Sequence, residues 1–336
     1  MYIESLELKN YRNYEALNIQ FDPGTNILLG DNAQGKTNIL ESMYLAGTTK
    51  SHRGSKDRDI IRFGEEESHI RLFLMREGIR HKIDMHLKKN KSKGAAIDGL
   101  PIRKASELFG LIHFVFFSPE DLNIIKNGPH ERRKFMDSEL CQINRLYLMQ
   151  LSGYNKVVLQ RNKLLKDLSF SDRMRDTLDI WDQQMISYGQ GIIGEREAFI
   201  RQVNSVLKEI HKNITGGREE IELIYEPNVK KEDLGQKLLQ ERERDLRQKI
   251  STVGPHRDDF CVMVNGIDIR KFGSQGQQRS AALSLKLSEI DLVRSMIHDQ
   301  PVLLLDDVLS ELDSSRQKYL LQSIRNIQTF ITCTGV

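Results

Sequence analysis

The chain has 336 residues, of which 39% are hydrophobic and 29% charged, with 50 lysines and arginines against 47 aspartates and glutamates. This length suggests two domains, or one large domain with an insertion. No apolar run approaches the roughly 18 residues needed to span a membrane, so we expect no membrane association. The three cysteines, Cys141, Cys261 and Cys333, are scattered, which excludes a disulfide framework and a cysteine-based zinc site. We therefore expect a cytoplasmic protein.

The first third of the chain begins with strand patterns. Apolar residues alternate loosely with polar ones over residues 3–8 and 17–21, and residues 26–29 predict a short buried strand that ends at Gly30. Residues 37–46 carry apolar side chains on one helical face, and Gly47 ends that helix. Residues 68–102 have the pattern of an antiparallel meander with a lysine-rich turn.

The middle of the chain changes to a helical period, with apolar side chains at three- and four-residue steps from about residue 131 to 211. The stripe around Trp181 is expected to be core. Beyond Gly216 and Gly217 the pattern predicts a charged helix at 232–249, strands at 260–269, a long helix at 277–298, a buried strand at 302–305 and a last strand at 330–332. We expect an α/β head formed by residues 1–125 and 245–336, and a helical lid formed by residues 126–244.

Residues 30–37 match the phosphate-binding pattern G-x-x-x-x-G-K-[ST] between a predicted strand and a predicted helix. The glycines let backbone N–H groups point at phosphate oxygens, and the helix adds its positive end. Lys36 would contact the β- and γ-phosphates, and the Thr37 hydroxyl would bind Mg²⁺. The predicted ATP-binding loop consists of Gly30, Asp31, Asn32, Ala33, Gln34, Gly35, Lys36 and Thr37.

The apolar run at 302–305 ends in two carboxylates, Asp306 and Asp307. A buried parallel strand that ends in an acid delivers it to the edge of the sheet where phosphates bind. Asp306 is the candidate second Mg²⁺ ligand, and Asp307 is the candidate general base for the attacking water. Alone, the same pattern would also fit a buried strand followed by a polar turn.

A third motif, residues 274–279, precedes the long helix and reads Ser-Gln-Gly-Gln-Gln-Arg. It resembles the signature motif of ABC ATPases, whose serine, glycine and helix N-terminus hold the γ-phosphate bound to the opposite subunit. Taken alone, Ser-x-Gly before a helix would be a plain N-cap. Residues 310–313 resemble the D-loop of the same ATPases. The candidates are Ser274, Gln275, Gly276 and Gln278 of the signature, acting in trans, and Ser310 and Asp313 of the D-loop.

The number of residues between the phosphate-binding loop and the signature motif distinguishes the classes of ABC ATPase. Thr37 and Ser274 are separated by 236 residues, whereas transporter ATPases have a shorter interval and SMC-type proteins insert long coiled coils. This intermediate interval resembles that of the RecF family of bacterial recombination-repair proteins. Six ordered segments carry the resemblance, at residues 9–14, 50–53, 117–122, 132–137, 254–259 and 274–279.

The resemblance implies an ABC-type P-loop ATPase head with an inserted helical lid. It implies an ATP- and Mg²⁺-dependent homodimer that binds DNA, whether single-stranded, duplex or at a gap junction. Such a protein would act with RecO and RecR proteins in recombinational repair, replication restart and SOS induction. The alternative is an ATPase subunit of another ABC class, either a transporter-type or an SMC-type head.

Several residues depart from the ABC pattern. Asp307 stands where ABC ATPases usually have glutamate, residues 118–121 offer no glutamine loop, and residues 332–334 contain no switch histidine. Weak ATP hydrolysis is the natural expectation. Family members usually run past residue 336, so we also expect a chain truncated at its C-terminus.

Other side chains are more ambiguous. Arg12 is a candidate ATP ligand, because it could stack on the adenine with Tyr11 and Tyr14, although packing at a strand end explains all three equally well. The histidines His52, His130 and His256 show no metal-binding spacing. Between Lys50 and Lys104, 15 basic residues face 8 acidic ones, which suits either a DNA-contacting surface or a solvated hairpin. The DNA-binding candidates are Arg53, Lys56, Lys88, Lys89, Lys91 and Lys93.

Overall fold

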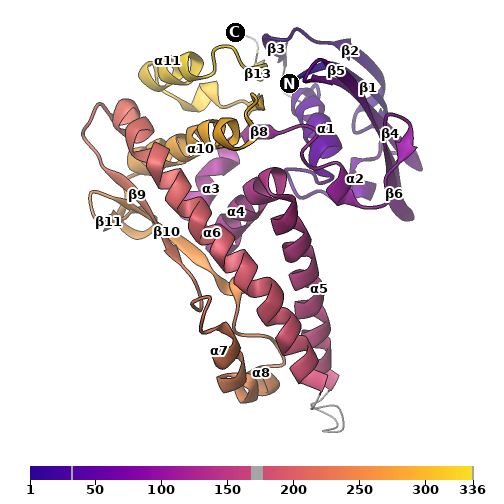
Figure 1. Cartoon of the computed structure of the whole chain (residues 1–336). Helices are drawn as coiled ribbons and strands as arrows, with labels where there is room; N and C mark the ends of the chain where they lie inside the picture. The colour runs from indigo at the N-terminus through magenta and orange to yellow at the C-terminus, as the bar shows by residue number, and fades with distance from the viewer. Residues whose placement is uncertain (32, 168–176, 335–336) are drawn as a thin grey trace. The chain divides into compact units, whose positions relative to one another are not determined.

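The computed structural model describes residues 1–31, 33–167 and 177–334. The chain forms two compact units (Figure 1). The first unit combines Met1–Asp121 with Lys286–Val336, and the second is Leu122–Leu285. The third predicted segment, residues 245–336, is therefore split, because residues 245–285 belong to the second unit. The functional division into an ATPase head and a lid stays a prediction.

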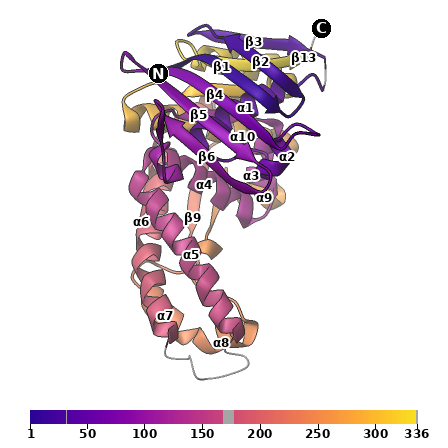
Figure 2. The ribbon, with the colours of Figure 1, turned by 90° about the vertical axis from the view of Figure 1, so that its right-hand side faces the viewer.

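The first unit contains a six-stranded antiparallel sheet, in which neighbouring strands are visible side by side in Figure 2. The alternation of apolar and polar residues puts one face of each long strand into the core. The predicted meander is present, with tight turns between its strands. In spatial order the strands are β2 (Tyr14–Gln20), β1 (Tyr2–Tyr11), β4 (Glu67–Arg76), β5 (Ile79–Lys88), β6 (Lys91–Ile97) and β7 (Leu100–Pro101).

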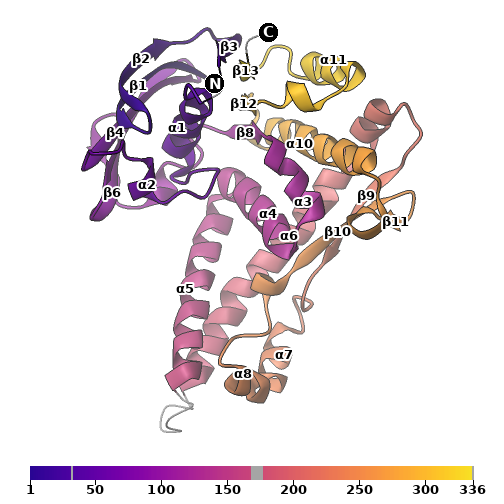
Figure 3. The ribbon, with the colours of Figure 1, turned by 180° about the vertical axis from the view of Figure 1, so that it is seen from behind.

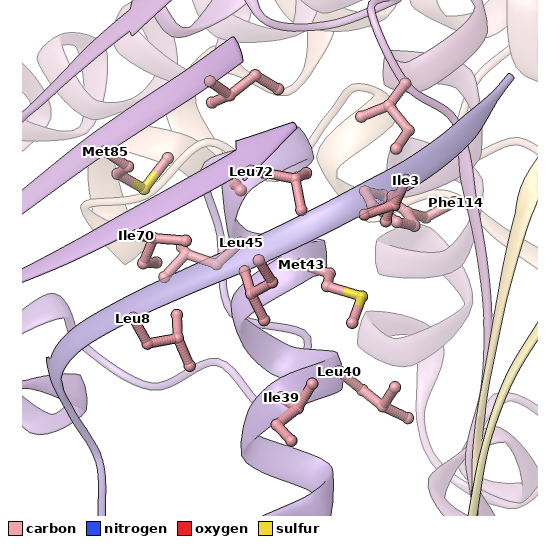
Figure 4. Packing of buried hydrophobic residues seen from close by; sticks show 14 of the residues in the cluster. Ile3, Leu8, Ile39, Leu40, Met43, Leu45, Ile70, Leu72, Met85 and Phe114 are labelled. Carbon is pink, nitrogen blue, oxygen red and sulfur yellow. The ribbon is translucent and has the colours of Figure 1, made fainter. Parts of the chain in front are cut away.

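A second, four-stranded sheet in the same unit is entirely parallel. Its spatial order is β3 (Thr25–Gly30), β13 (Thr329–Thr334), β12 (Val302–Asp306) and β8 (Phe114–Phe117). Helix α1 (Lys36–Thr48) contributes apolar side chains to one core cluster that also contains residues of both sheets, among them Leu40, Leu72 and Phe114 (Figure 4). Because the strands are parallel, their carboxyl ends meet at one edge, where ligands bind in open α/β sheets.

The prediction that residues 26–29 form a buried strand is wrong for one of its faces. Strand β3 lies at the edge of the parallel sheet, and Ile27 and Leu29 are 57% and 69% exposed. Leu28, on the opposite face, packs against the core cluster. A short apolar run predicts burial on both faces only for a central strand, and sequence alone does not tell an edge strand from a central one.

The first unit also contains short elements around the sheets. They are α2 (Asp57–Ile60), the 3₁₀ helices η1 (Ala105–Glu107), η2 (Pro119–Asp121) and η5 (Leu309–Glu311), and α11 (Ser314–Ser323).

The second unit is built around two long helices, α5 (Arg145–Asp167) and α6 (Thr177–Thr215), which run side by side (Figure 3). Strand β9 (Ile221–Glu226) packs beside α6 and pairs with β10 (Asp259–Val264). This pairing holds the chain after residue 245 in the second unit. The remaining elements are α3 (Leu122–Lys126), α4 (Pro129–Ile143), α7 (Leu234–Gln240), α8 (Arg242–Gln248), η4 (Pro255–Arg257), β11 (Ile267–Asp268), α9 (Ile269–Phe272) and the N-terminal part of α10 (Gln275–Ile297), whose residues from Lys286 onward belong to the first unit.

Two further predictions about helices can be compared with the structure. The charged helix predicted at 232–249 is two short helices, α7 and α8, which meet at Glu241. The long helix before the acidic strand is confirmed as α10. Among the described helices, none is long and apolar enough to cross a membrane.

Candidate functional site

The predicted phosphate-binding loop joins β3 to α1, as the motif predicts. Of its eight residues, Asn32 lies outside the described part of the chain. Lys36 Nζ donates to the carbonyl oxygens of Gly30 and Asp31 at 2.6 and 2.7 Å. The first turn of α1 has no side-chain cap, and the first N–H groups of a helix have no partner within the helix. The loop therefore presents a lysine and a positive helix end at the same point.

Gly35 is required by both conformation and space. Its φ of +99° lies in the region that favours glycine. A β-carbon there would lie 2.6 Å from the side chain of Asn13 and 2.8 Å from the hydroxyl of Tyr14. Both of these side chains donate to the carbonyl oxygen of Gln34, at 3.1 and 3.3 Å. The β1–β2 turn thus packs against the loop.

Asp306 ends β12 and lies beside the start of α1. Its Oδ1 accepts hydrogen bonds from the Thr37 hydroxyl at 2.8 Å and from the Thr332 hydroxyl at 2.9 Å. Burial raises the pKa of Asp306, and the two threonine hydroxyls act against this shift. A desolvated carboxylate beside a hydroxyl supplies the oxygen ligands that Mg²⁺ prefers, so the donors at this position fit that ion. Thr37 and Asp306 are the residues predicted as metal ligands.

Asp307 is exposed and has a φ of +54°. Its N–H donates to the Thr332 hydroxyl at 2.9 Å, while the Ser310 hydroxyl donates to its carbonyl oxygen at 2.8 Å and to its Oδ1 at 3.2 Å. The backbone thus turns sharply between the two acids. Asp306 stays with Thr37 while the carboxylate of Asp307 reaches solvent. Asp313, the other candidate from the D-loop, caps α11 by accepting from the N–H of Arg316.

Arg12 is bound to Glu41, a carboxylate that is completely buried on α1. Arg12 Nε and Nη2 donate to its two oxygens at 2.9 and 2.7 Å, and the Ser51 hydroxyl donates to Oε1 at 2.6 Å. Burial alone would raise the pKa of Glu41, but the hydrogen bonds from Arg12 and Ser51 lower it. Nη1 of Arg12 donates to the carbonyl oxygen of Asp59. These contacts use most of the N–H groups at the edge of the guanidinium, whereas its face is the part on which a base could stack.

Two charged residues near the phosphate loop were not among the residues predicted to bind nucleotide or metal. Arg53, predicted as a DNA contact, has Nη1 3.4 Å from the side-chain oxygen of Asn38 in the first turn of α1, and its charge lowers the pKa of Asp306. Glu120 follows β8, the strand beside β12, and its charge raises that same pKa. Only the adjacency of β8 and β12 indicates that Glu120 faces this carboxylate.

The signature segment begins α10 in the second unit. Ser274 and Gln277 form a capping box, in which each side chain accepts from the other's N–H, at 3.2 and 3.0 Å. The prediction that Ser274 caps the N-terminus of the helix is therefore confirmed. Ser274, Gln275 and Gly276 are exposed, whereas Gln278 is buried and donates to the carbonyl oxygen of Ile269 at 2.7 Å.

Gly276 has no internal reason to be glycine. Its φ is not in the left-handed region, and among the described residues a β-carbon added there would meet only Ser274 Oγ within 4 Å, at 3.9 Å. Glycine in a helix is about 1 kcal/mol less favourable than alanine. The packing of the chain therefore does not explain a glycine in the first turn of α10.

A cluster of charged side chains, Arg132, Asp259 and Arg270, links the signature segment to the rest of the second unit. Asp259 accepts two hydrogen bonds from Arg132, at 2.6 and 3.0 Å, and pairs with Arg270 at 3.1 Å. Arg270 belongs to α9, the short helix whose Ile269 carbonyl holds Gln278. The strand that carries Asp259 is thus linked by charge to the helix that immediately precedes the signature segment.

Two of the three histidines considered from sequence, His52 and His256, have packing contacts. His52 stacks on Phe116 with ring centroids 4.0 Å apart. His256 Nδ1 lies 2.7 Å from the Tyr154 hydroxyl, and burial lowers its pKa to about 4. His130 is exposed.

The candidate DNA-binding lysines differ in their surroundings. Lys93 is bound to the Thr49 carbonyl oxygen at 2.6 Å and to Asp57 at 2.8 Å. Lys88 and Lys89 lie 3.9 and 2.9 Å from Glu67 and Glu66, whereas Lys56 and Lys91 are exposed. Whether any of them contacts DNA stays a prediction.

The fold and the loop together define the ATPase-head class shared by RecF and SMC proteins. A family model described as "RecF/RecN/SMC N terminal domain" matches residues 2–334. The chain is 58% identical over 338 residues to "DNA replication and repair protein RecF" of Lachnospira eligens, covering 100% of this chain and 93% of the relative. The protein of that name from Lachnoclostridium phytofermentans is also 58% identical, over 336 residues, with the same coverage. This chain belongs to the RecF family.

Comparison with solved structures supports the assignment to the RecF family. "Structure of the recombination mediator protein RecF-ATP in RecFOR pathway" matches with a TM-score of 0.95 and 36% identity, covering 100% of this chain and 92% of that chain. A structure described as "Crystal structure of the SmcHead bound to the C-winged helix domain of ScpA" matches with a TM-score of 0.58 and 16% identity, covering 100% and 90%. The second similarity concerns the fold alone.

Asp121, next to Glu120, provides a pH-dependent test of the geometry at this edge. Burial raises its pKa from 3.8 to about 6, against the charge of Lys286 and the N–H of Ser118. The folded state therefore binds more protons than the unfolded state between about pH 4 and 6, and the free energy of unfolding falls as pH rises through that range. From pH 4 to 7, we expect the wild type to lose on the order of 2 kcal/mol relative to Asp121→Asn, measured by urea unfolding.

The exposed neighbour supplies the control for this measurement. Of the groups that raise or lower the pKa of Asp121, Glu120 has the smallest effect. Glu120→Gln should therefore reduce the pH-dependent loss of stability of the wild type only slightly, whereas Asp121→Asn should abolish it. Parallel profiles for Asp121→Asn and the wild type would show that the Asp121 carboxyl is not desolvated.

Proposed function

We propose that this chain is an ATP-dependent DNA-binding protein of the RecF type. ATP and Mg²⁺ bind at the loop 30–37 and at Asp306, and ATP drives dimerisation on DNA, followed by slow hydrolysis. The protein acts in recombinational DNA repair, replication restart and SOS induction, together with RecO and RecR. The relatives named for DNA replication and repair, and a solved relative described as RecF-ATP in the RecFOR pathway, support this proposal.

The contact between Thr37 and Asp306 is the observation that carries the proposal. These residues are 269 positions apart in sequence, and their side-chain oxygens lie 2.8 Å apart. When bound, Mg²⁺ supplies charge neutralisation at the β- and γ-phosphates. Lys36 holds the phosphates, and Arg53 adds positive charge next to the first turn of α1. Asp307 accepts a proton from the attacking water, and its short side chain, together with its solvent exposure, agrees with slow turnover.

The second half of the catalytic site is supplied in trans by a partner copy. Ser274, Gln275 and Gly276 are exposed at the N-terminus of α10, where N–H groups and the helix dipole favour an anion. Within the part of the chain that the structure describes, Gly276 has no packing role, which supports close approach of a group from outside the chain. We propose that this group is the γ-phosphate bound to the partner.

Two substitutions separate nucleotide binding from chemistry. Lys36→Ala should weaken ATP binding about 10- to 100-fold, because a hydrogen bond to a charged group contributes about 1.5–3 kcal/mol. Asp307→Asn should retain ATP affinity and lower kcat by about 100-fold or more, as expected for the loss of a general base. Isothermal titration and phosphate release measure the two effects. Lys50→Ala, an exposed lysine outside the loop, is the control; unchanged ATP affinity in Lys36→Ala would refute the assignment.

The trans site predicts opposite effects of one substitution on stability and on assembly. Gly276→Ala should stabilise the monomer by about 0.5 kcal/mol, because alanine favours the helix and its methyl group has space. The same methyl group would stand between the partner's γ-phosphate and the N–H groups of α10, so ATP-dependent dimerisation should weaken. Thermal unfolding and light scattering with ATP and with ADP measure the two effects.

Complementation makes the same test more stringent. Ser274→Arg should bind ATP as a monomer but neither dimerise nor hydrolyse it. Mixing it with Lys36→Ala leaves one complete composite site, and part of the ATPase activity should return. Normal hydrolysis by Ser274→Arg alone would mean that the site is not shared.

The predicted DNA surface is tested most cleanly with its exposed lysines. If Lys56 and Lys91 contact phosphates, replacing both with glutamine should reduce the slope of log affinity against log salt by up to about two. Fluorescence anisotropy with a short duplex measures this slope. Lys230→Gln, an exposed lysine of the second unit, is the control. An unchanged slope in the double variant would place the DNA contacts elsewhere.

A further inference from the structure

Three potential metal ligands meet on the outer face of the six-stranded sheet. Glu67 and His69 are two residues apart on β4 and therefore point to the same face. The β4–β5 register places His86 directly opposite His69. The potential ligand atoms of the three side chains all lie within 4.8 Å of one another. The strands that carry them, β4 and β5, are adjacent in Figure 2.

Both imidazoles direct the same nitrogen toward one carboxylate. His86 Nε2 lies 2.9 Å from Glu67 Oε2, and His69 Nε2 lies 3.8 Å from Glu67 Oε1. The two rings are stacked, with centroids 4.0 Å apart and an interplanar angle of 21°. An ion pair between Glu67 and His86 alone would explain one histidine but not the alignment of both.

The surroundings favour the neutral form of His69, which is the form in which an imidazole binds metals. Burial lowers the pKa of His69, and the neighbouring charges of His86 and Lys9 lower it further, while Glu67 acts in the opposite direction. Lys88 also lies near the cluster, 3.9 Å from Glu67. These groups come from β1, β4 and β5, the strands that surround His69.

A hollow adjoins the cluster. Its volume is about 730 Å³, and its lining includes His69 and His86 together with Gly94, Ala95 and Ala96 of β6. The small side chains of β6 leave space beside the histidines, so a water molecule or a small ligand can reach them.

We propose that Glu67, His69 and His86 form a binding site for a transition-metal ion, with zinc as the best match. Two imidazole nitrogens and one carboxylate oxygen are ligands of Zn²⁺, which accepts three protein ligands and leaves a fourth position for water or another ligand. Magnesium and calcium prefer sites made only of oxygen. Zn–N and Zn–O distances near 2.1 Å place tetrahedral ligands about 3.4 Å apart, a small adjustment for exposed side chains. The site is separate from the nucleotide loop and does not depend on the proposed function.

The experiment uses the full chain after treatment with EDTA and desalting. Isothermal titration with zinc chloride should give one zinc ion per chain at this site, and the affinity should fall at least tenfold in both His69→Gln and His86→Gln. Glu67→Gln should weaken binding as well. His81→Gln, a histidine on the same strand as His86 that pairs with Asp98, should bind zinc like the wild type. All these side chains are partly exposed, so the variants should fold normally, and circular dichroism checks this.

A second measurement distinguishes this cluster from the cysteines. Cobalt chloride replaces zinc as an optical probe: a nitrogen–oxygen site gives visible ligand-field bands without thiolate charge-transfer absorption. These bands should be present in the wild type and absent in His69→Gln. Strong thiolate absorption, an unchanged zinc isotherm in both histidine variants, or no zinc binding by the wild type would each overturn the proposal.

Discussion

The buried carboxylate of Glu41 is the constraint around which the nucleotide loop is arranged. A carboxylate with no exposed surface in the core is tolerated only when it is paired and hydrogen-bonded. Arg12, Tyr11 and Ser51 fulfil this requirement, and they come from the end of β1 and from the segment after α1. Removing one partner of such a pair costs about 3–5 kcal/mol. Both neighbouring segments are thereby held against α1.

The two segments held by Glu41 carry residues that contact the phosphate loop and the first turn of α1. The β1 end leads directly into Asn13 and Tyr14, which bind the carbonyl oxygen of Gln34 within the phosphate loop. The segment that begins with Ser51 carries Arg53, which reaches Asn38 in the first turn of α1. The buried charge of Glu41 thus orients the β1–β2 turn, which packs against the phosphate loop, and the side chain of Arg53 beside the loop. Asp306 then enters from the parallel sheet, whose strand direction brings it to Thr37.

The parts of this site that were predictable from sequence are those determined locally. The phosphate loop has a fixed spacing because the backbone itself wraps the phosphates, and an apolar strand that ends in an acid is equally local. Long-range pairing was not predictable. The exposure of Ile27 and Leu29 depends on the edge position of β3, and the membership of residues 245–285 in the second unit depends on the pairing of β9 with β10. The contacts of Arg53 and the meeting of His69 with His86 likewise arise only when distant segments come together.

In the second unit, the ion pairs of buried arginines orient neighbouring segments and add little net stability. Arg161 pairs with Asp182 and Asp245, and Arg196 with Asp137 and Asp258, all with little or no exposure of the arginine. Desolvation offsets most of the attraction in such pairs, so apolar side chains of similar size would give comparable stability. Ion pairs, unlike apolar contacts, demand one orientation. Asp259, next to Asp258, extends this requirement through Arg270 to α9, where the Ile269 carbonyl fixes Gln278. We infer that this series of directional contacts sets the direction of the α10 N-terminus, and an anion site made of N–H groups depends on that direction.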